Sequence, residues 1–310
     1  MQANPGVGFV GLGQMGQPMA LNILKATGNE EEICVYDVRE ERIAPLIALG
    51  ASQAFCPAGV ARSGGIVFTM VPDDQALLQV ALSEDGLLSH LGPGGIHLSL
   101  STISPELACQ LAKLYAHRGS SFLAATVLGR PDVAQRAELS LFLSGEAAAK
   151  QRVKPYLTAL ARKIHDLGDQ IEAAPIVKIA ANFLIAASVE AMGEAAALVE
   201  GYGFDRARFL RMLVESPLFR GNVFEGYGEM IGARDFSDAK FPVGLGLKDA
   251  ELAKRAGQHS GVDLPYIDAL LEHLMAARTV GRESEDWSVL TEFARAQPGR
   301  APLTKEARFS

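Results

Sequence analysis

The sequence predicts an α/β chain in which a doubly wound parallel sheet precedes an all-α C-terminal domain. From Val7 to about Gly145, short apolar runs alternate with helix-period segments, as expected of parallel strands that helices cover on both faces. After about Gly168 this strand pattern ends, and long stretches rich in Ala, the best helix former, take its place. A length of 310 residues also suits about two domains.

Six segments are predicted strands because they are rich in β-branched, aromatic and other apolar residues and are bounded by turn-forming residues. They are Val7 to Val10, Ile33 to Asp37, Ile66 to Val71, Ile96 to Ser101, Ser121 to Val127 and Leu139 to Ser144. Three prolines, Pro72, Pro105 and Pro131, follow strand ends, where proline removes no donor from a ladder. Together these segments predict an α/β domain over residues 1–168.

Four later segments are predicted helices, which gives an all-helical domain over residues 169–296. They are Val177 to Tyr202, Asp205 to Glu215, Val243 to Ser260 and Asp263 to Val280. The most apolar stretch, from Ile176 to Val199, contains charged and amide side chains and therefore lacks the roughly 18 uninterrupted apolar residues of a membrane span. We expect it to be a buried helix. Residues 297–310 have little apolar content and are expected to form a mobile tail.

Composition and charge narrow the partners. The chain carries 29 basic and 36 acidic residues, a net charge of −7, so it lacks the basic excess of a nucleic-acid-binding protein. Its three cysteines are odd in number and lack metal-ligand spacing, which predicts reduced thiols and no metal site. No basic segment followed by an apolar run opens the sequence, so no secretory signal is expected. We therefore predict a cytoplasmic protein with neither nucleic acid nor membrane as a partner.

A glycine motif follows the first predicted strand and opens a predicted helix. Gly11-Leu12-Gly13-Gln14-Met15-Gly16 has the Gly-x-Gly-x-x-Gly pattern, which in this context predicts dinucleotide binding. Gly11 allows the tight turn, Gly13 lets backbone N–H groups approach a pyrophosphate, and Gly16 lets helix and strand pack closely. The helix N-terminus favours the phosphate charge. A glycine-rich turn without a ligand is the alternative interpretation.

Asp37 ends the next predicted strand, about twenty residues after the last glycine. A carboxylate there accepts hydrogen bonds from ribose hydroxyls and repels a 2′-phosphate, which favours NAD over NADP. Arg39 lies two residues later, and its guanidinium could reach a 2′-phosphate or remain a solvated charge at a helix start. NAD is therefore the predicted cofactor, with NADP as the alternative.

The twelve residues from Gly11 to Asn22 resemble the N-terminal signature of the β-hydroxyacid dehydrogenase family. This family includes 3-hydroxyisobutyrate dehydrogenases and shares its NAD-binding domain with 6-phosphogluconate dehydrogenase. The resemblance continues through nearly the whole chain. It implies a Rossmann domain that binds the dinucleotide, followed by a helical domain that serves substrate binding and dimerisation. It further implies an NAD(P)-dependent oxidoreductase acting on a small hydroxy acid or the matching aldehyde or keto acid, and a homo-oligomer, dimeric or tetrameric.

The resemblance also implies cofactor contacts at the ends of two strands and near the end of the chain. Met70-Val71-Pro72 matches a family turn beside the cofactor, which implicates Val71 and Pro72. Thr102, in Ser99-Leu100-Ser101-Thr102-Ile103, matches a threonine near the nicotinamide and the substrate. A helix cap is the alternative role for Thr102, although Ser104 suits a cap better. Lys248 matches a family lysine that contacts the cofactor or closes the site.

Lys178 is the principal catalytic candidate. Its neighbours are Ile176, Val177, Ile179 and two alanines, and such surroundings desolvate an ammonium group and lower its pKa toward the range useful for proton transfer. Asn182 lies at i+4, on the same helix face. A lysine that snorkels from a helix end is the alternative interpretation. The family resemblance implies that Lys178 exchanges a proton with the substrate oxygen and that Asn182 helps to place the substrate or the lysine.

The predicted substrate loop departs from the family pattern. Relatives carry Asp-Ala-Pro-Val-Ser-Gly-Gly, in which the serine and glycine hold a carboxylate, whereas this chain has Leu128, Gly129 and Arg130 at the last three positions. Arg130 could clamp a carboxylate, or it could point to solvent or to the cofactor. The change points to a bulkier or less acidic substrate and leaves two further hypotheses: C=N reduction, as in imine reductases, and a dinucleotide-binding sensor without catalysis.

Overall fold

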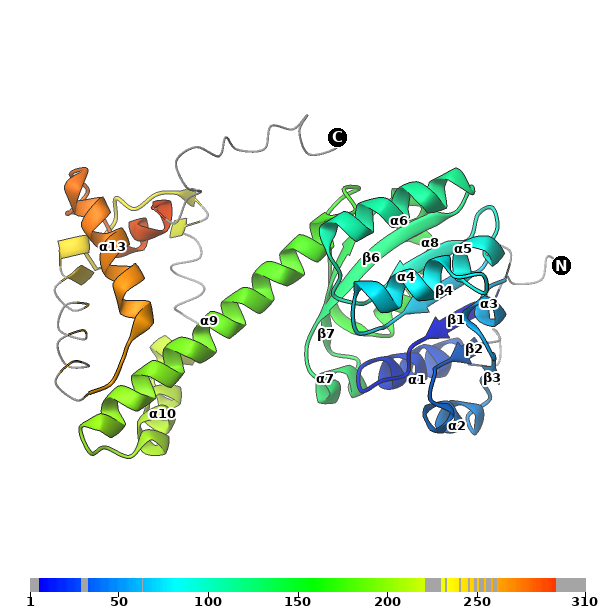
Figure 1. Cartoon of the computed structure of the whole chain (residues 1–310), viewed down its shortest axis with the longest axis horizontal. Coiled ribbons are helices and arrows are strands. Elements are labelled where there is room, and N and C mark those ends of the chain that lie inside the picture. The colour runs from blue at the N-terminus through cyan, green and yellow to red at the C-terminus, as the bar shows by residue number, and fades with distance from the viewer. Residues whose placement is uncertain are drawn as a thin grey trace. The chain divides into compact units, whose positions relative to one another are not determined.

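Within the described residues, an eight-stranded sheet forms the centre of the N-terminal unit (Figure 1). The computed structural model describes residues 6–28, 33–62, 64–220, 230–231, 233–239, 241–244, 246–247, 250, 254, 258 and 261–293. The strands are β1 (Val7–Val10), β2 (Ile33–Tyr36), β3 (Ser52–Gln53), β4 (Ile66–Thr69), β5 (Ile96–Ser99), β6 (Ser121–Leu128), β7 (Leu139–Ser144) and β8 (Ala161–Asp166). The sheet confirms the predicted α/β fold.

The strand order is β3-β2-β1-β4-β5-β6-β7-β8, and every neighbouring pair from β3 to β6 is parallel. The chain builds outward from β1 in one direction and then returns to build outward from β4 in the other. This change of direction is a topological switch point, at which open α/β sheets bind ligands beyond the carboxyl ends of their strands. The predicted glycine motif follows β1 and so lies at that point.

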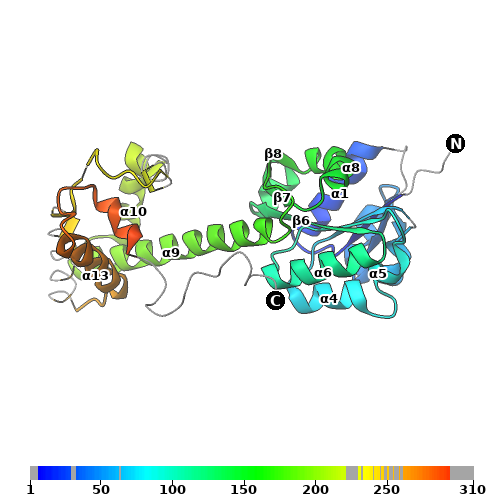
Figure 2. The same ribbon diagram turned by 90° about the horizontal axis from the view of Figure 1, so that it is seen from above.

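Helices cover both faces of the sheet, as Figure 2 shows. One side carries α1 (Gly16–Thr27), α7 (Pro131–Gln135) and α8 (Ala147–Thr158), and the other carries α4 (Asp74–Leu82), α5 (Leu87–His90) and α6 (Pro105–His117). The short segments η1 (Glu40–Arg42), α2 (Ala44–Ile47) and α3 (Pro57–Val60) lie in the connections around β2 and β3. Each sheet face thus has a buried apolar layer, and this burial supplies the main stabilising free energy.

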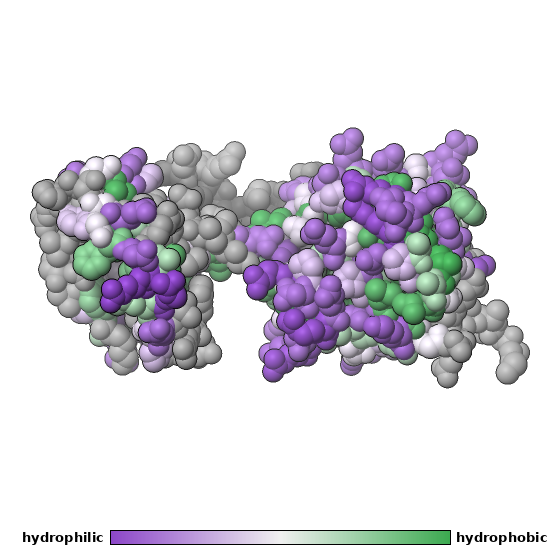
Figure 3. All heavy atoms as spheres, turned by 90° about the horizontal axis from the view of Figure 1, so that it is seen from below, coloured by the Kyte–Doolittle hydropathy of each residue, from purple (hydrophilic) through white to green (hydrophobic). Residues whose placement is uncertain are grey.

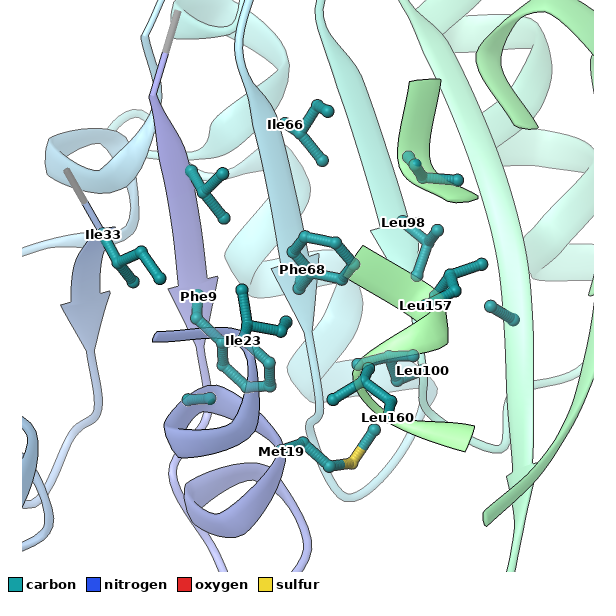
Figure 4. Packing of buried hydrophobic residues seen from close by; sticks show 14 of the residues in the cluster. Phe9, Met19, Ile23, Ile33, Ile66, Phe68, Leu98, Leu100, Leu157 and Leu160 are labelled. Carbon is teal, nitrogen blue, oxygen red and sulfur yellow. The ribbon is translucent and has the colours of Figure 1, made fainter. Parts of the chain in front are cut away.

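The layer under α1 and α8 is built from strand and helix residues that interdigitate (Figure 4). Phe9 and Phe68 stack with ring centroids 6.1 Å apart. Met19 and Ile23 of α1 are 0% and 1% exposed, and they pack with these rings in one cluster. This packing fixes α1 under the sheet and places its N-terminus at the carboxyl end of β1.

Polar side chains predominate on the face of the N-terminal unit drawn in Figure 3.

Two features of the sheet differ from the predicted pattern. β7 runs antiparallel to β6, because only residues 129–138 connect them and a parallel return needs a crossover of about a dozen residues or more. β3 and β8 were not predicted as strands: β3 has two residues, and β8 reads Ala-Arg-Lys-Ile-His-Asp, which has no apolar run. β8 is an edge strand, where charged side chains guard against pairing with other chains.

Helix α9 (Ala173–Gly201) begins in the N-terminal unit, which spans Met1–Leu184, and continues into the second unit, Ile185–Ser310. The predicted helix starts at Val177, whereas the helix in the structure starts four residues earlier, at Ala173. Pro175 lies in the first helical turn, where its missing N–H costs nothing. Ile176, Ile179 and Leu184 are 49%, 44% and 53% exposed, so the expectation that this apolar stretch is buried is wrong here.

The second unit is helical where it is described. It contains α10 (Arg206–Glu215), the 3₁₀ segments η2 (Pro217–Arg220) and η3 (Trp287–Glu292), and α13 (Pro265–Thr279). Its small core consists of Phe236, Val243, Leu247, Ala250, Leu274, Ala277 and Val289. The predicted helix over 243–260 lies partly outside the described residues, and the predicted tail lies wholly outside them. No helix in the described part of the chain is long and apolar enough to cross a membrane.

Candidate functional site

The glycine motif forms a tight turn between β1 and α1. Gly11 has φ +93°, a conformation that side chains disfavour, and a Cβ added to it would overlap the Met70 carbonyl. A Cβ on Gly16 would overlap the Gly11 carbonyl and lie 3.3 Å from the Phe9 ring. Both glycines are therefore required by the fold of the turn itself.

Gly13 is different because its surroundings are open. A Cβ there would meet only the Arg42 guanidinium, 3.7 Å away. The fold of the turn would therefore accept a side chain at Gly13, whereas a ligand lying against the backbone would not. This arrangement fits a dinucleotide pyrophosphate, which needs close backbone approach and the N-terminus of a helix such as α1.

Asp37 follows β2 and faces the glycine turn. The residue is 7% exposed, and its carboxylate accepts hydrogen bonds from the N–H of Leu12 (2.6 Å) and the N–H of Arg39 (2.9 Å). The Arg42 guanidinium lies 3.7 Å from Asp37 Oδ2 and forms an ion pair with it. The carboxylate thus links the glycine turn to the end of β2 and keeps acceptor capacity for a further partner.

A cleft of about 1030 Å³ opens over this region. It brings together eight of the predicted cofactor residues: Gly11, Gly13, Gln14, Met15, Gly16, Asp37, Val71 and Pro72. Leu12 is buried, and its backbone N–H donates a hydrogen bond to Asp37, which lines the cleft. Thr102, Leu128, Gly129, Arg130, Lys178 and Asn182 do not line this cleft, and Lys248 lies outside the described residues.

Several lining residues were not predicted. Val38 and Phe55 also line the cleft and are 83% and 85% exposed, which is unusual for apolar side chains and suits contact with a flat ring such as adenine. Arg42 and Cys56 line it as well. Val38 adjoins Asp37 and could have been found from that position. Phe55 and Arg42 lie in connections whose sequence gives no cofactor signal.

The turn after β4 is held by the turn after β5. The N–H of Val71 donates to the hydroxyl of buried Ser101 over 2.8 Å. Thr102 follows Ser101 and is exposed. Ser104, not Thr102, caps α6, because its hydroxyl accepts the Leu107 N–H at 3.2 Å. Thr102 therefore does not cap α6. It lies at the carboxyl edge of the sheet, where ligands bind in this fold.

Two buried hydroxyl groups fasten the start of α9 to the sheet. Thr126 of β6 donates from Oγ1 to the Ala174 carbonyl at 3.0 Å. Ser144 of β7 donates to the Ile171 carbonyl at 2.7 Å and accepts the Ala174 N–H at 3.2 Å. Both side chains are fully buried, and Figure 1 shows α9 starting beside these strands.

Lys178 lies one helical turn after Ala174. It is 8% exposed, and burial lowers the pKa of its ammonium group below the ordinary lysine value. Ala174 is fully buried and lies at i−4, so both residues lie on the same side of α9. Asn182, one turn further, is exposed. The desolvation that the sequence predicted for Lys178 is therefore present, whereas Asn182 lies beyond the buried stripe.

The predicted substrate loop follows β6. Gly129 has φ +152°, and a Cβ there would lie 2.5 Å from Leu139 Cδ2, so glycine is required. Leu128 is half-buried, and the Arg130 side chain is 86% exposed, 3.8 Å from Asp132. Of the alternatives for Arg130, the structure places its guanidinium in solvent beside a carboxylate.

Comparison with known proteins matches both units to one family. Residues 6–168 match the NAD binding domain of 6-phosphogluconate dehydrogenase, and residues 173–293 match the NAD-binding domain of NADP-dependent 3-hydroxyisobutyrate dehydrogenase. The chain belongs to the β-hydroxyacid dehydrogenase family. It is an NAD(P)-dependent oxidoreductase, as the resemblance of its glycine signature predicted.

Individual relatives align with this chain along nearly their whole length. The uncharacterized oxidoreductase YfjR of Bacillus subtilis is 39% identical over 92% of this chain and 98% of its own. The NAD-dependent L-serine dehydrogenase of Pseudomonas aeruginosa is 30% identical over 93% and 97%. A reductive aminase from Aspergillus terreus has the same fold, with a TM-score of 0.78, 22% identity and coverage of 94% of this chain and 100% of that one.

Proposed function

We propose that this enzyme transfers hydride between nicotinamide and a small hydroxy acid or its aldehyde or keto acid partner, with Lys178 as the general acid and base. The observation that carries the proposal is the burial of Lys178 on the stripe of α9 that is fastened to β6 and β7. β6 is parallel to the strands that lead into the cofactor cleft, so its carboxyl end lies at the same edge of the sheet as theirs.

A nicotinamide cofactor, when bound, supplies or accepts the hydride. The chain must then supply or accept one proton at the substrate oxygen. Lys178 Nζ in its ammonium form donates that proton during reduction, and the neutral amine takes it during oxidation. Burial lowers the pKa of Lys178, which makes the neutral form accessible nearer neutral pH than for an exposed lysine.

The hydroxy acid class is supported by the relatives. The Pseudomonas aeruginosa relative is named for L-serine, which is itself a β-hydroxy acid, and it aligns with 93% of this chain. The departures at Leu128 and Arg130 argue for a substrate bulkier or less acidic than those of typical relatives, because neither side chain offers a buried hydroxyl or cation to a carboxylate.

NAD is the proposed cofactor in preference to NADP. The buried Asp37 carboxylate supports NAD, since it can accept from ribose hydroxyls and repels a 2′-phosphate. Arg42 reduces this preference for NAD, because its ion pair with Asp37 partly neutralises the carboxylate charge at the mouth of the cleft. We therefore expect a preference for NAD that is moderate in size.

C=N reduction is the second candidate, and the substrate loop favours it. Leu128 makes the loop more apolar than a serine would, and the solvent-facing guanidinium of Arg130 leaves no cation of this loop to bind a carboxylate. An uncharged cyclic imine does not need such a cation. The retention of a lysine at position 178 argues for C=O chemistry instead.

A substrate panel tests these alternatives. L-serine and other 3-hydroxy acids, semialdehydes, glyoxylate and cyclic imines are assayed with NAD(H) and NADP(H) while absorbance at the nicotinamide band is followed. Turnover of hydroxy acids or their carbonyl partners supports the proposal, and turnover of imines alone favours C=N reduction. Tight NADH binding by calorimetry with no turnover across the panel would leave a cofactor-binding sensor.

We also propose a cytoplasmic homo-oligomer in which a second copy covers the exposed apolar face of α9. Ile176, Ile179 and Leu184 recur at helical spacing and are each more than 40% exposed. Sedimentation velocity should show a species of at least twice the 33.0 kDa chain mass. Ile176→Glu together with Ile179→Glu should shift that species toward the monomer, and a monomeric wild-type chain contradicts this proposal.

A further inference from the structure

We propose that Thr126 is a positioning residue for Lys178. The inference rests on the proposed function, because it assigns Thr126 a part in catalysis only through the lysine. The juxtaposition that carries it is the hydrogen bond from Thr126 Oγ1 in β6 to the Ala174 carbonyl, one helical turn before Lys178 in α9.

The backbone of α9 does not require this hydrogen bond. In an α-helix the Ala174 carbonyl already accepts the Lys178 N–H, so the hydroxyl of Thr126 adds a second donor to a satisfied acceptor. A valine of the same shape would fill the site without burying a hydroxyl. The hydroxyl of Thr126 therefore serves to hold this turn of α9 against the sheet. It does so at the Ala174 carbonyl, which also accepts the N–H of Lys178.

The N–H groups of the first turn are satisfied by other partners. Ala173 donates to the Gln170 carbonyl at 3.0 Å, Ala174 donates to Ser144 Oγ at 3.2 Å, and Pro175 has no N–H. Ser144 thus caps α9 from β7, and its loss should weaken the helix start as a whole. The contribution of Thr126 is narrower, since it bonds one carbonyl on the face that carries Lys178.

Thr126 also joins the two halves of the proposed site. It lies in β6 two residues before Leu128, so one residue connects the strand that leads into the substrate loop with the helix that carries the lysine. Loss of one buried hydrogen bond, with the shape of the side chain kept, costs only a small part of the stability of a domain. A shift of about 1 Å in a proton donor, in contrast, costs as much as 10²-fold in rate.

The experiment compares Thr126→Val, which keeps the shape, with Thr126→Ser, which keeps the hydroxyl. Ser120→Ala is the matched control, because Ser120 is a buried hydroxyl just before β6 that donates to the Tyr115 carbonyl of α6 at 3.1 Å, away from α9. If Thr126→Val does not fold, Thr126→Ala takes its place. Melting temperatures of all variants are measured first.

The first readout needs no substrate. Acetic anhydride modifies lysine amines, and peptide mass spectrometry gives the modification of Lys178 relative to exposed Lys113 in the same sample. We expect Thr126→Val to raise the relative reactivity of Lys178 about threefold or more, and Thr126→Ser and Ser120→Ala to leave it within twofold of wild type. Equal reactivity in wild type and Thr126→Val overturns the inference.

The second readout is turnover in two backgrounds. Thr126→Val should lower kcat by about 10 to 10² with the cofactor Kd unchanged, and it should cause no further loss in a Lys178→Ala background. The same fractional loss in both backgrounds would show that Thr126 acts independently of Lys178. Full turnover in Lys178→Ala alone contradicts the proposed function instead, and the labelling result then still decides the role of Thr126.

Discussion

The backbone N–H of Leu12 donates a hydrogen bond to Asp37 Oδ2 over 2.6 Å, between residues 25 positions apart in the sequence. This contact ties the glycine turn to the end of β2. It also connects Leu12, whose side chain is buried, with the cleft, because its backbone N–H orients the Asp37 carboxylate that faces the cleft.

Asp37→Asn should shift the cofactor preference from NADH toward NADPH. The variant keeps an oxygen that can accept the Leu12 N–H but removes the charge that repels a 2′-phosphate. We expect kcat/KM for NADH to fall about tenfold, which corresponds to about 1.4 kcal/mol, and kcat/KM for NADPH to rise. Steady-state kinetics with both cofactors measures the change.

Arg42→Ala should shift the cofactor preference further toward NADH. Its removal leaves Asp37 without its ion-pair partner, so NADPH should bind several-fold more weakly while NADH is nearly unaffected. Arg136→Ala is the control, because Arg136 pairs with Asp132 and Glu138 outside the cleft. Greater kcat/KM for NADPH than for NADH in the wild type would overturn the proposed NAD preference.

Gly13→Ala and Gly16→Ala should fail in different ways. The open surroundings of Gly13 let the variant fold, with a melting temperature near that of wild type, while the new methyl group blocks approach of the pyrophosphate and weakens NADH binding at least tenfold. Gly16→Ala should instead lower the melting temperature, because its Cβ overlaps the Gly11 carbonyl. Calorimetric titration with NADH and thermal unfolding separate the two effects.

The opposite pattern would contradict the description of this turn. Wild-type NADH affinity in Gly13→Ala would mean that the pyrophosphate does not approach this part of the backbone. A wild-type melting temperature in Gly16→Ala would mean that α1 and β1 are less tightly packed than the structure shows.

Sequence reasoning predicted most of the Rossmann sheet because its strands are apolar and bounded by turns. It missed β8 because the strand covers an edge and carries Arg162, Lys163 and Asp166. It also predicted no antiparallel pair, since strand direction depends on the length of the β6–β7 connection and not on the composition of either strand.

The site was predictable where function constrains short motifs. The glycine turn, Asp37 and the Met70-Val71-Pro72 turn meet in one cleft as expected. The places of Phe55 in the cleft and of Thr126 beside α9 were not found, because each depends on contacts between segments far apart in the sequence. The Thr126 to Ala174 bond spans 48 positions, and no local pattern around either residue indicates it.

His97 should make the N-terminal unit sensitive to acid. Its buried ring bonds Thr69 Oγ1 at 3.0 Å and the Tyr115 hydroxyl at 2.7 Å, and burial lowers its pKa from 6.5 to about 3. Between these values the unfolded chain binds a proton that the folded chain does not. Stability is therefore retained above pH 6.5 and lost as pH falls, by about 2 kcal/mol at pH 5.

Urea unfolding at pH 7 and pH 5 measures this loss, with His97→Asn as the comparison. The variant should be less stable at pH 7, because it gives up buried hydrogen bonds worth about 1 to 3 kcal/mol, but it should lose less stability between the two pH values. An identical pH dependence in both proteins would show that His97 does not remain neutral in the folded state.

Lys178→Met should stabilise the fold at neutral pH while lowering kcat by about 10² to 10⁴. Burial lowers the pKa of Lys178, so folding at neutral pH either buries an ammonium charge or releases its proton, and both reduce stability. Methionine has no charge and therefore removes this free-energy cost. We expect a gain of a few degrees in melting temperature at pH 7, equivalent to about 1 kcal/mol. The gain should shrink as pH rises toward about 10.4, where the unfolded lysine also loses its proton.

In the proposed mechanism, Lys178 exchanges the proton that accompanies hydride transfer. The most direct measurement compares wild type with Lys178→Ala for both kcat, using the best substrate of the panel, and NADH affinity by calorimetry. We expect a loss of about 10² to 10⁴ in kcat with NADH affinity nearly unchanged. Unchanged kcat in Lys178→Ala would rule out this role of the lysine.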